Sequence, residues 1–253
     1  MAAVAEQPLI HGEGRGEHSW RPWLAHADVR QLQLRDCLAP TARLVVVAPH
    51  PDDEVLACGG LLSMHAESGG AVLLVAVTDG EASHRGSTVW TRSELASRRC
   101  SERVQGLERL GLPAAQIERL ALPDGHLAEH MAALRSRLLA LLQPDDVLVS
   151  TWPHDGHPDH EAAGRAARLA CRAVGCVFMA APVWMWHWAA PADPRVPWTR
   201  LRALPLSAAV VARKLSALAA HRSQLAAADG STEPVLGRAI RSRAGWPCEY
   251  YFV

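Results

Sequence analysis

The sequence predicts a doubly wound, Rossmann-like α/β fold, in which helices cover both faces of a mostly parallel sheet. Two observations support this class. Short apolar runs typical of strands occur at residues 44–48, 71–77, 117–122 and 147–150. Segments with helical periodicity separate them, at residues 54–68, 93–110, 131–142 and 161–174. Strands that alternate with helices form parallel βαβ units, and burial on both faces explains why the runs are continuously apolar.

The chain is expected to form a single domain over residues 1–253. A chain of 253 residues can bury one sizeable core, and it contains no internal repeat or low-complexity linker. Residues 1–40 are rich in His, Gly and charge, so we interpret them as an irregular N-terminal extension. Trp20 and Trp23 are the side chains expected to anchor this extension to the body of the domain.

Charge and hydropathy argue against two classes of partner. Lys plus Arg equals Asp plus Glu, at 26 each, which gives no electrostatic case for a nucleic acid or an anionic membrane. No apolar run approaches the roughly 20 residues of a membrane span, and residues 1–17 do not resemble a secretory signal. The oligomeric state stays open, with a homo-oligomer among the options.

The six cysteines indicate the compartment. They are scattered along the chain without a Cys-x-x-Cys pair, at Cys37, Cys58, Cys100, Cys171, Cys176 and Cys248. In a chain of this size without a signal, such cysteines are typical of reduced, buried thiols. We therefore expect a cytoplasmic protein.

Two clusters of metal-binding residue types follow two of the predicted strands. Residues 48–54 read Ala-Pro-His-Pro-Asp-Asp-Glu, and residues 154–160 read His-Asp-Gly-His-Pro-Asp-His. In open α/β sheets, ligands bind beyond the carboxyl ends of the strands, where the strand order reverses. The strands at 44–48 and 147–150 can be neighbours at that point. The two clusters are then expected to face each other across one crevice.

These residue types suit a hydrolytic metal centre. His50, Asp53 and His160 form a set of two His and one carboxylate, which leaves a zinc ion one open position for water. Asp52, beside this set, is the candidate general base. His157 is the candidate for stabilising the oxyanion and protonating the leaving amine, with Asp159 orienting it and keeping its pKa high.

Two other interpretations remain. Asp52 or Asp53 can simply cap the helix that begins near residue 54. The domain can also be a non-catalytic module that binds a nucleotide, but such modules need a Gly-rich phosphate-binding loop after the first strand. This chain has His50-Pro51-Asp52-Asp53-Glu54 there instead. Burying so many titratable groups without a metal or substrate would be costly, which favours the metal site.

The motifs His50-Pro51-Asp52-Asp53-Glu54 and Gly156-His157-Pro158-Asp159-His160 resemble those of the zinc-dependent sugar de-N-acetylases, the PIG-L or LmbE-like family. This family includes deacetylases of N-acetylglucosaminyl-phosphatidylinositol and of mycothiol and bacillithiol synthesis. The resemblance covers residues 44–164 and extends more weakly to residue 224. It implies zinc, or another divalent ion such as Fe²⁺, and it gives the residues above the same roles.

The resemblance extends to five further positions. Arg99, in an Arg-x-x-Glu element, and Asp124 are implied to bind the substrate; a helix-face ion pair and a simple turn are the structural alternatives. Lys214, His221 and Gln224 match a C-terminal element whose role is open, and their spacing places them on one face of a predicted helix over residues 206–228. Some family members have a Tyr at the position of Asp155. Any contribution of that Tyr to catalysis is therefore absent from this chain or supplied by another residue.

The aromatic segment Trp184-Met185-Trp186-His187-Trp188 alternates like a strand, with three indoles on one face. A wall for a sugar substrate is one use of such a face. Core packing or a subunit contact is the commoner use of such a face, and we expect one of these two rather than a substrate wall. His187 is not expected to be a metal ligand.

The expected reaction is hydrolysis of an acetamide to acetate and a free amine. The resemblance implies an N-acylated sugar or glycoside as the small-molecule substrate. An amidase that cleaves a thiol-conjugate amide with the same zinc site is the rival activity.

Overall fold

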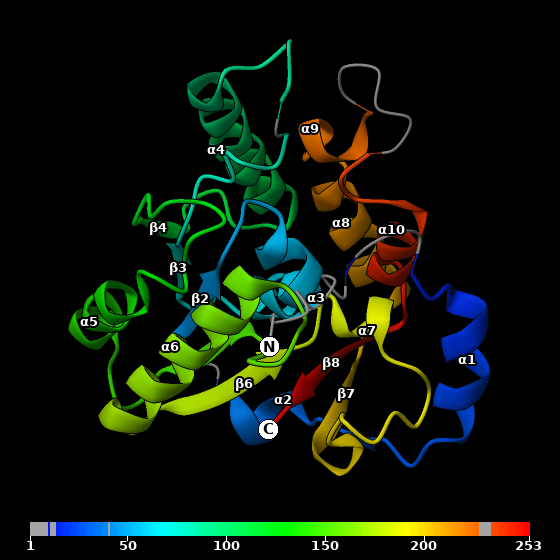
Figure 1. The fold of residues 1–253 in the computed structure, drawn as a ribbon. Helices are drawn as coiled ribbons and strands as arrows, with labels where there is room; N and C mark the ends of the chain where they lie inside the picture. The colour runs from blue at the N-terminus through cyan, green and yellow to red at the C-terminus, as the bar shows by residue number, and fades with distance from the viewer. Residues whose placement is uncertain (1–9, 11–13, 40, 85, 228–233) are drawn as a thin grey trace, which may run out of the picture.

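A computed structural model describes residues 10, 14–39, 41–84, 86–227 and 234–253 of the chain. These residues form an eight-stranded sheet in the order β1-β7-β8-β6-β5-β2-β3-β4 (Figure 1). The strands are β1 Arg30–Gln31, β2 Leu44–Ala48, β3 Val72–Ala76, β4 Gln116–Arg119, β5 Val147–Thr151, β6 Val177–Ala181, β7 Leu201–Pro205 and β8 Cys248–Phe252. All neighbouring strands are parallel except β8, which is antiparallel to both β6 and β7.

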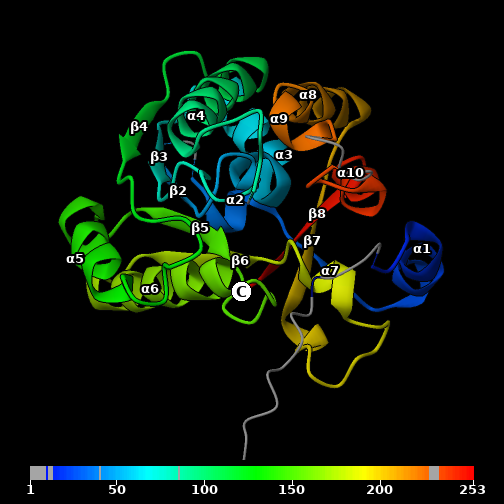
Figure 2. The same ribbon diagram turned by 45° about the horizontal axis from the view of Figure 1, so that its top comes forward.

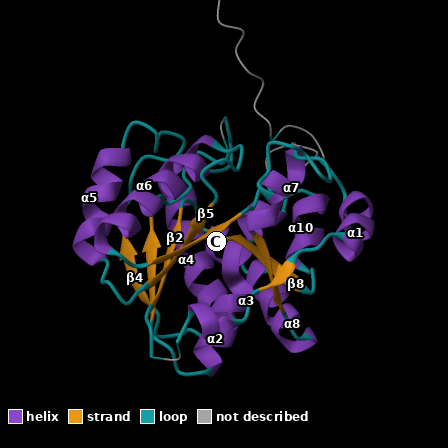
Figure 3. Ribbon diagram, turned by 90° about the horizontal axis from the view of Figure 1, so that it is seen from below, coloured by secondary structure: helices purple, strands orange, loops and turns teal. Residues whose placement is uncertain are grey.

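Helices cover both faces of this sheet (Figures 2 and 3). Their bounds are α1 Glu17–His26, α2 Leu34–Cys37, α3 Asp53–Glu67, α4 Arg92–Arg109, α5 Met131–Leu141, α6 Pro158–Val174, α7 Met185–Trp188, α8 Ala208–Leu218, α9 Arg222–Leu225 and α10 Arg238–Ala244. A 3₁₀ turn spans Trp198–Arg200. The expected α/β class with a mostly parallel, helix-covered sheet is thus confirmed.

The central strand β2 shows why its apolar run is continuous. Leu44 and Val46 pack into a core shared with α3, α4 and α8, whereas Val45 and Val47 pack against α5 and α6 on the opposite face. Because successive side chains of a strand point to opposite faces, a strand covered on both sides has no polar positions. The β2 residues are buried throughout.

The chain reverses its direction across the sheet next to β2. It first moves outward from β2 through β3 to β4, and then returns to place β5 on the other side of β2. β2 and β5 are parallel neighbours, with Leu44 opposite Val147 and Val47 opposite Ser150. Their carboxyl ends therefore lie side by side, as predicted.

The N-terminal segment differs from the expectation of an irregular extension. Residues 17–26 form helix α1, and Arg30–Gln31 adds an edge strand beside β7. Trp20 is fully buried, and its indole N–H donates to the carbonyl of Trp186 over 2.9 Å. This aromatic packing stabilises a helix that contains Pro22 and whose sequence alone is a weak helix signal.

Two further predictions about the C-terminal third were wrong. The helix expected over residues 206–228 is divided, because α8 ends at Leu218 and α9 begins only at Arg222. The alternating aromatic segment is helix α7 with its preceding turn, not a strand. Strands β6, β7 and β8 were not predicted. Tertiary packing overrides the local pattern in these short elements.

The cysteines also depart from the expectation of six reduced thiols. Cys171 and Cys176 form a disulfide across the end of α6. Cys58, Cys100 and Cys248 are free thiols, and the side chain of Cys37 lies outside the described residues. None of the helices in the described part of the chain has both the length and the apolar character needed to cross a bilayer.

Docking of α1 gives the first testable prediction. Trp20→Ala is expected to lower the free energy of unfolding by about 3–5 kcal/mol, because it empties a fully buried indole site. Urea denaturation measures this change. Trp90→Ala, which removes a partly buried indole under Arg98, is the control and should cost about 1 kcal/mol or less. A loss for Trp20→Ala as small as that expected of the control would mean that burial of Trp20 does not stabilise the fold.

Candidate metal centre

His50 and Asp53 lie in the turn that joins β2 to α3. Asp53 is the first residue of α3, and its Oδ2 atom accepts the backbone N–H of His50 over 2.9 Å. The same oxygen lies 3.0 Å from Nδ1 of His50. Both side chains are buried. The short turn thus brings an imidazole and a carboxylate together at the carboxyl end of the central strand.

His160 reaches the same point from helix α6, which follows the neighbouring strand β5. Helix α6 begins at Pro158, a residue favoured at the first helical position, so that His160 lies in the first turn. Its Nε2 atom is 3.2 Å from Oδ2 of Asp53, and its Nδ1 atom is 2.8 Å from Oδ2 of Asp155. The structure therefore brings the three predicted ligands together.

The donor atoms of His50, Asp53 and His160 fit a small divalent ion. They lie within 4.8 Å of one another, and tetrahedral zinc places neighbouring ligand atoms about 3.3 Å apart. Oδ2 of Asp53 is the atom nearest both imidazoles. The side chains that would hold a metal thus converge on one point.

A second triad shares His50 but fits a metal less well. The ligand atoms of His50, His157 and Asp159 also lie within 4.8 Å of one another. Both carboxylate oxygens of Asp159, however, already accept backbone N–H groups, from Gly125 over 2.7 Å and from Leu127 over 3.0 Å. The first triad therefore fits a metal ion better than the second.

The electrostatics at the first triad favour positive charge. Burial lowers the pKa of His160, but the carboxylates of Asp53 and Asp155 outweigh it and raise that pKa to about 9. Burial raises the pKa of Asp53, whereas His160 and His50 bring it well below its usual range. A buried carboxylate that stays ionised between two imidazoles is a suitable environment for a cation.

Asp52 lies beside this triad in an unusual backbone conformation. Its φ of 134° is a rare value for a residue other than glycine, and such strain is concentrated at functional sites. Asp52 precedes α3, but its side chain makes no capping hydrogen bond. The alternative that Asp52 is simply a helix cap is therefore wrong.

Arg99 holds the Asp52 carboxylate. Its Nη2 atom lies 3.0 Å from Oδ2 of Asp52 and donates to the carbonyl of Pro51, while Nη1 donates to the carbonyl of Gly80, each over 2.8 Å. Gly80 has a φ of +69°, and a Cβ there would lie 1.9 Å from Nη1 of Arg99. Burial raises the pKa of Asp52 to about 7, although Arg99 opposes this shift. A helix-face ion pair of Arg99 is not what the structure shows.

His157 caps α6 and faces the same cavity. Its Nδ1 atom accepts the backbone N–H of Asp159 over 3.2 Å. Burial, together with the charges of His160 and His50, lowers the pKa of His157 to about 3. The ring is therefore neutral, with its proton on Nε2.

The expectation that the Asp159 side chain orients His157 and keeps its pKa high was wrong. The Asp159 carboxylate instead binds backbone N–H groups and lies 3.2 Å from Nε2 of His50. Asp124 contacts the same Nε2 atom of His50 through its Oδ1 atom, at 3.2 Å. The Oδ2 atom of Asp124 accepts the backbone N–H of Ala82 over 2.8 Å. Asp124 is thus part of the site rather than only of a turn.

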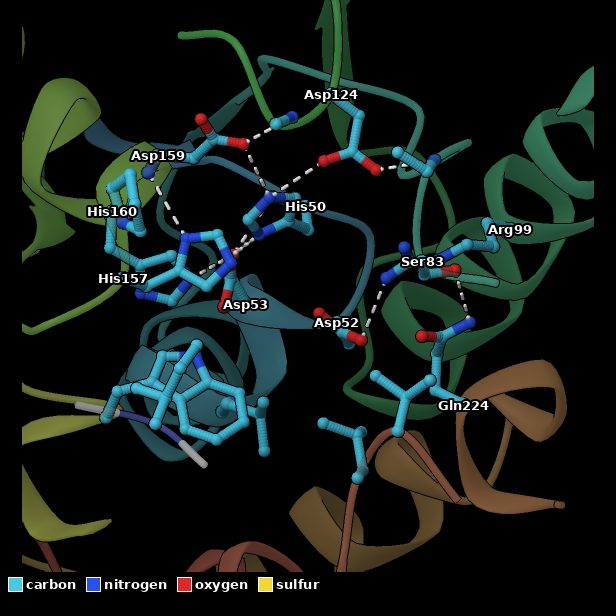
Figure 4. A pocket seen from close by; sticks show the side chains of 18 residues that line it. His50, Asp52, Asp53, Ser83, Arg99, Asp124, His157, Asp159, His160 and Gln224 are labelled. Atoms are coloured by element: carbon cyan, nitrogen blue, oxygen red, sulfur yellow. Dashed lines mark hydrogen bonds and ion pairs between the residues drawn. The ribbon is translucent and has the colours of Figure 1, made fainter. Parts of the chain in front are cut away.

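These side chains line one cavity of about 420 Å³ (Figure 4). The polar side holds all eight residues for which a catalytic, metal-binding or substrate-binding role was predicted. The opposite side is largely apolar. The lining residues are Ile10, His50, Asp52, Asp53, Leu56, Ala82, Ser83, Arg99, Asp124, Gly125, His157, Pro158, Asp159, His160, Trp184, Gln224, Val235 and Leu236.

The three C-terminal candidates do not share a helix face. Lys214 lies in α8 and pairs with Glu249 over 2.6 Å, away from the cavity. His221 precedes α9 and is fully buried, with Nε2 4.0 Å from Oε1 of Glu54. Gln224, in α9, lines the cavity, and its Oε1 atom has no hydrogen-bond partner.

The aromatic segment is divided among three environments. Trp184 lines the cavity, with its ring centroid 6.5 Å from that of His157. Trp186 lies in the aromatic core beside Trp20, as the packing interpretation predicts. The indole N–H of Trp188 donates to the carbonyl of Asp155 over 2.8 Å.

Asp155 supports the candidate site from a position that the sequence did not reveal. It is fully buried and accepts backbone N–H groups from Val183, Trp184 and Met185 while holding Nδ1 of His160. A carboxylate behind a metal-binding imidazole fixes its tautomer and orientation. The one available signal was its place five residues before His160, within the same motif.

Comparison with known proteins places the site within a matched family region. The model of the PIG-L family, described as GlcNAc-PI de-N-acetylase, matches residues 45–171, half of the chain. This region contains all of β2 except its first residue, β3 through β5, and both segments that carry the candidate metal ligands.

Individual relatives share moderate identity. Diacetylchitobiose deacetylase of Thermococcus kodakarensis is 32% identical over 127 residues, which cover 48% of this chain and 46% of the relative. A 1D-myo-inositol 2-acetamido-2-deoxy-alpha-D-glucopyranoside deacetylase of Mycolicibacterium vanbaalenii is 28% identical over 198 residues, covering 67% and 63%. Each match spans less than two thirds of the relative's length.

A solved structure supports the fold. The zinc inhibited form of teicoplanin deacetylase Orf2 superposes with a TM-score of 0.62 at 16% identity, covering 83% of this chain and 97% of that one.

Single substitutions distinguish the two triads. His50→Ala, Asp53→Ala and His160→Ala are each expected to reduce bound divalent metal from about one ion per chain to a small fraction, because each removes a ligand. His157→Ala should retain the metal. Elemental analysis of the purified proteins measures the ratio. Retention by His160→Ala with loss by His157→Ala would instead assign the ion to the second triad.

Asp155→Asn is expected to weaken metal binding by about 10- to 100-fold, because an amide cannot accept from His160 and three backbone N–H groups together. Competition with a chromophoric chelator measures the dissociation constant. Asp145→Asn, at an exposed position, is the matched control and should leave the constant unchanged. Equal affinities for both variants would remove Asp155 from the metal centre.

Proposed function

The chain belongs to the PIG-L family of GlcNAc-PI de-N-acetylases, and we propose that it is a metal-dependent hydrolase that removes an N-acetyl group from a small molecule containing an amino sugar. One observation carries this proposal. His50, Asp53 and His160 converge beside Asp52 in a cavity at the carboxyl ends of β2 and β5.

His50, Asp53 and His160 are the residues that would hold the ion. Zinc is the proposed metal, and Fe²⁺ is the alternative, since the set of two imidazoles and one carboxylate suits several divalent ions. When bound, such an ion acidifies a water molecule and polarises the amide carbonyl of the substrate. Asp155 fixes the orientation of His160 for this purpose.

Asp52 is proposed to accept the proton of the attacking water. Its carboxylate lines the cavity and is held by Arg99, so that it cannot rotate freely. A pKa of about 7 lets the group take up a proton and release it again near neutral pH, which is what a general base that later serves as an acid requires. Asp52 can therefore also deliver the proton to the leaving amine.

His157 is proposed to stabilise the oxyanion. Because Nδ1 accepts the N–H of Asp159, the neutral ring carries its proton on Nε2 and can donate it in a hydrogen bond. The hydrogen bond from a donor that is already oriented in a buried site becomes stronger as negative charge develops on the carbonyl oxygen. This role replaces the protonated imidazole expected from the sequence.

The cavity has the dimensions of a small-molecule site. Its volume of about 420 Å³ lies within the range of roughly 300–1,000 Å³ typical of ligand pockets. Asp124 lies on its polar side, where a carboxylate can accept sugar hydroxyl groups, and we propose this contact. We propose that Arg99 also contacts the substrate while it holds the carboxylate of Asp52. The relatives named above are deacetylases of N-acetylated sugars, which supports this substrate class.

Acetate release tests the proposed reaction. We expect the metal-loaded protein to release acetate from N-acetylglucosamine glycosides, and a chelator to abolish the release. Because a structural neighbour is known in a zinc inhibited form, the assay should compare Zn²⁺ and Fe²⁺ over a range of concentrations. Faster hydrolysis of mercapturate-type amides than of every sugar would favour the rival amidase.

Asp52→Asn is expected to retain the metal while turnover falls by about 10²- to 10⁴-fold, because the amide cannot accept the proton. The acetate assay together with metal analysis separates this effect from loss of the ion. Asp145→Asn again serves as the exposed control. Near wild-type turnover of Asp52→Asn would exclude Asp52 as the general base.

A further inference from the structure

A second, much smaller cavity is lined by residues of α3, α7, α8, α10 and β8. Its volume is about 40 Å³. Leu56 lines both this cavity and the larger one. In Figures 1 and 2, α10 lies beside α8 and α7 in this part of the molecule.

Arg243 lines the small cavity with a guanidinium group that lacks a counterion. The side chain is 8% exposed, and burial lowers its pKa to about 10. Nη1 donates to the carbonyl of Arg15 over 3.3 Å, whereas Nη2 is buried without a hydrogen-bond partner. An uncompensated buried charge is costly, and a guanidinium does not lose its proton to avoid the cost.

The carboxylates near Arg243 are already engaged. Glu249, which lines the same cavity, binds Lys214 over 2.6 Å and accepts from Gly60, Leu61 and the Tyr251 hydroxyl. Asp155 acts on Arg243 only through its charge, because its oxygens are held by His160 and three backbone N–H groups. Among the described residues, Arg243 therefore contributes one net positive charge that no side chain neutralises.

Trp246 provides a second donor in the same place. It is 5% exposed and lines the cavity, and its indole Nε1 atom is also buried without a partner. The hydroxyl of Tyr250 and the thiol of Cys248 in the cavity wall are neutral groups. Two unpaired donors and an unpaired positive charge thus belong to residues that line one small cavity.

We propose that this cavity binds a small monovalent anion such as chloride, held by Nη2 of Arg243 and Nε1 of Trp246. The volume of about 40 Å³ exceeds the roughly 10–15 Å³ needed for one water-sized group but is far below that of a metabolite site. One negative charge balances the one unpaired guanidinium. The anion also accepts hydrogen bonds from Nη2 of Arg243 and Nε1 of Trp246, which have no partner in the protein.

The anion would support the metal centre from behind. Pro182, Val183 and Trp186 form one wall of the cavity. Val183 belongs to the backbone segment whose N–H groups hold Asp155, which in turn orients His160. The site is structural, and it does not depend on which substrate the protein hydrolyses.

The thermal stability of the full chain, measured in sodium chloride against sodium gluconate at constant ionic strength, tests the proposal. We expect the wild-type Tm to rise by about 2–5 °C for each tenfold increase in chloride above its dissociation constant. Bromide should act like chloride. Gluconate is too large for the cavity and should not.

Arg243→Gln is expected to lose this chloride dependence. Arg241→Gln, an exposed arginine on the same helix, should respond as the wild type does. An equal chloride response in Arg243→Gln and the wild type would overturn the proposal. If Arg243→Gln does not fold, Trp246→Phe, which removes one donor and keeps an aromatic ring, should weaken the response.

Crystals soaked in sodium bromide give an independent measurement. An anomalous peak within hydrogen-bond distance of Nη2 of Arg243 and Nε1 of Trp246 supports the site. Water alone in this position, with no anomalous signal, would overturn it. Neither result depends on catalytic activity, so that failure of the anion site and failure of the proposed hydrolase reaction are distinguishable.

Discussion

The Asp53 carboxylate between His50 and His160 is the interaction on which the rest of the site depends. Its Oδ2 atom lies 3.0 Å from one imidazole and 3.2 Å from the other. These imidazoles come from segments more than 100 residues apart, and the adjacency of β2 and β5 brings them together. Because the two strands are parallel neighbours, both segments leave the sheet at the same edge.

A layer of buried polar residues supports this small group. Asp155 holds His160, Arg99 holds Asp52, and Asp159 fixes the loop at Gly125 through its backbone N–H groups. Each of these side chains has partners with defined geometry, which offsets the cost of removing it from water. Side chains held this firmly lose little entropy when a ligand binds.

Charge is distributed unequally around the cavity. The pKa of Asp52 is raised by burial, whereas that of Asp53, only one residue away, is lowered by two imidazoles. Neighbouring carboxylates whose pKa values are moved apart can divide the work, one holding a cation and one exchanging protons. His157 remains neutral beside them, because burial and the nearby histidines disfavour a further positive charge.

The sequence by itself determined the α/β class, the helices and strands between residues 44 and 174, and the two polar segments that meet in the cavity. Continuous apolar runs occur where strands are covered on both faces, and the turn after such a strand has few options for its polar residues. Arg99 and Asp124, distant in sequence, were identified only through resemblance to a family. Their contacts with Asp52 and His50 needed coordinates.

Only the tertiary structure decided how the peripheral elements are formed and which partner each polar group takes. Trp20 of helix α1 packs among other indoles, and the fully buried His221 lies between α8 and α9. Asp159 turned out to bind backbone N–H groups rather than His157. Local pattern carries no information about such contacts, because the partners come from segments that meet only after the chain has folded.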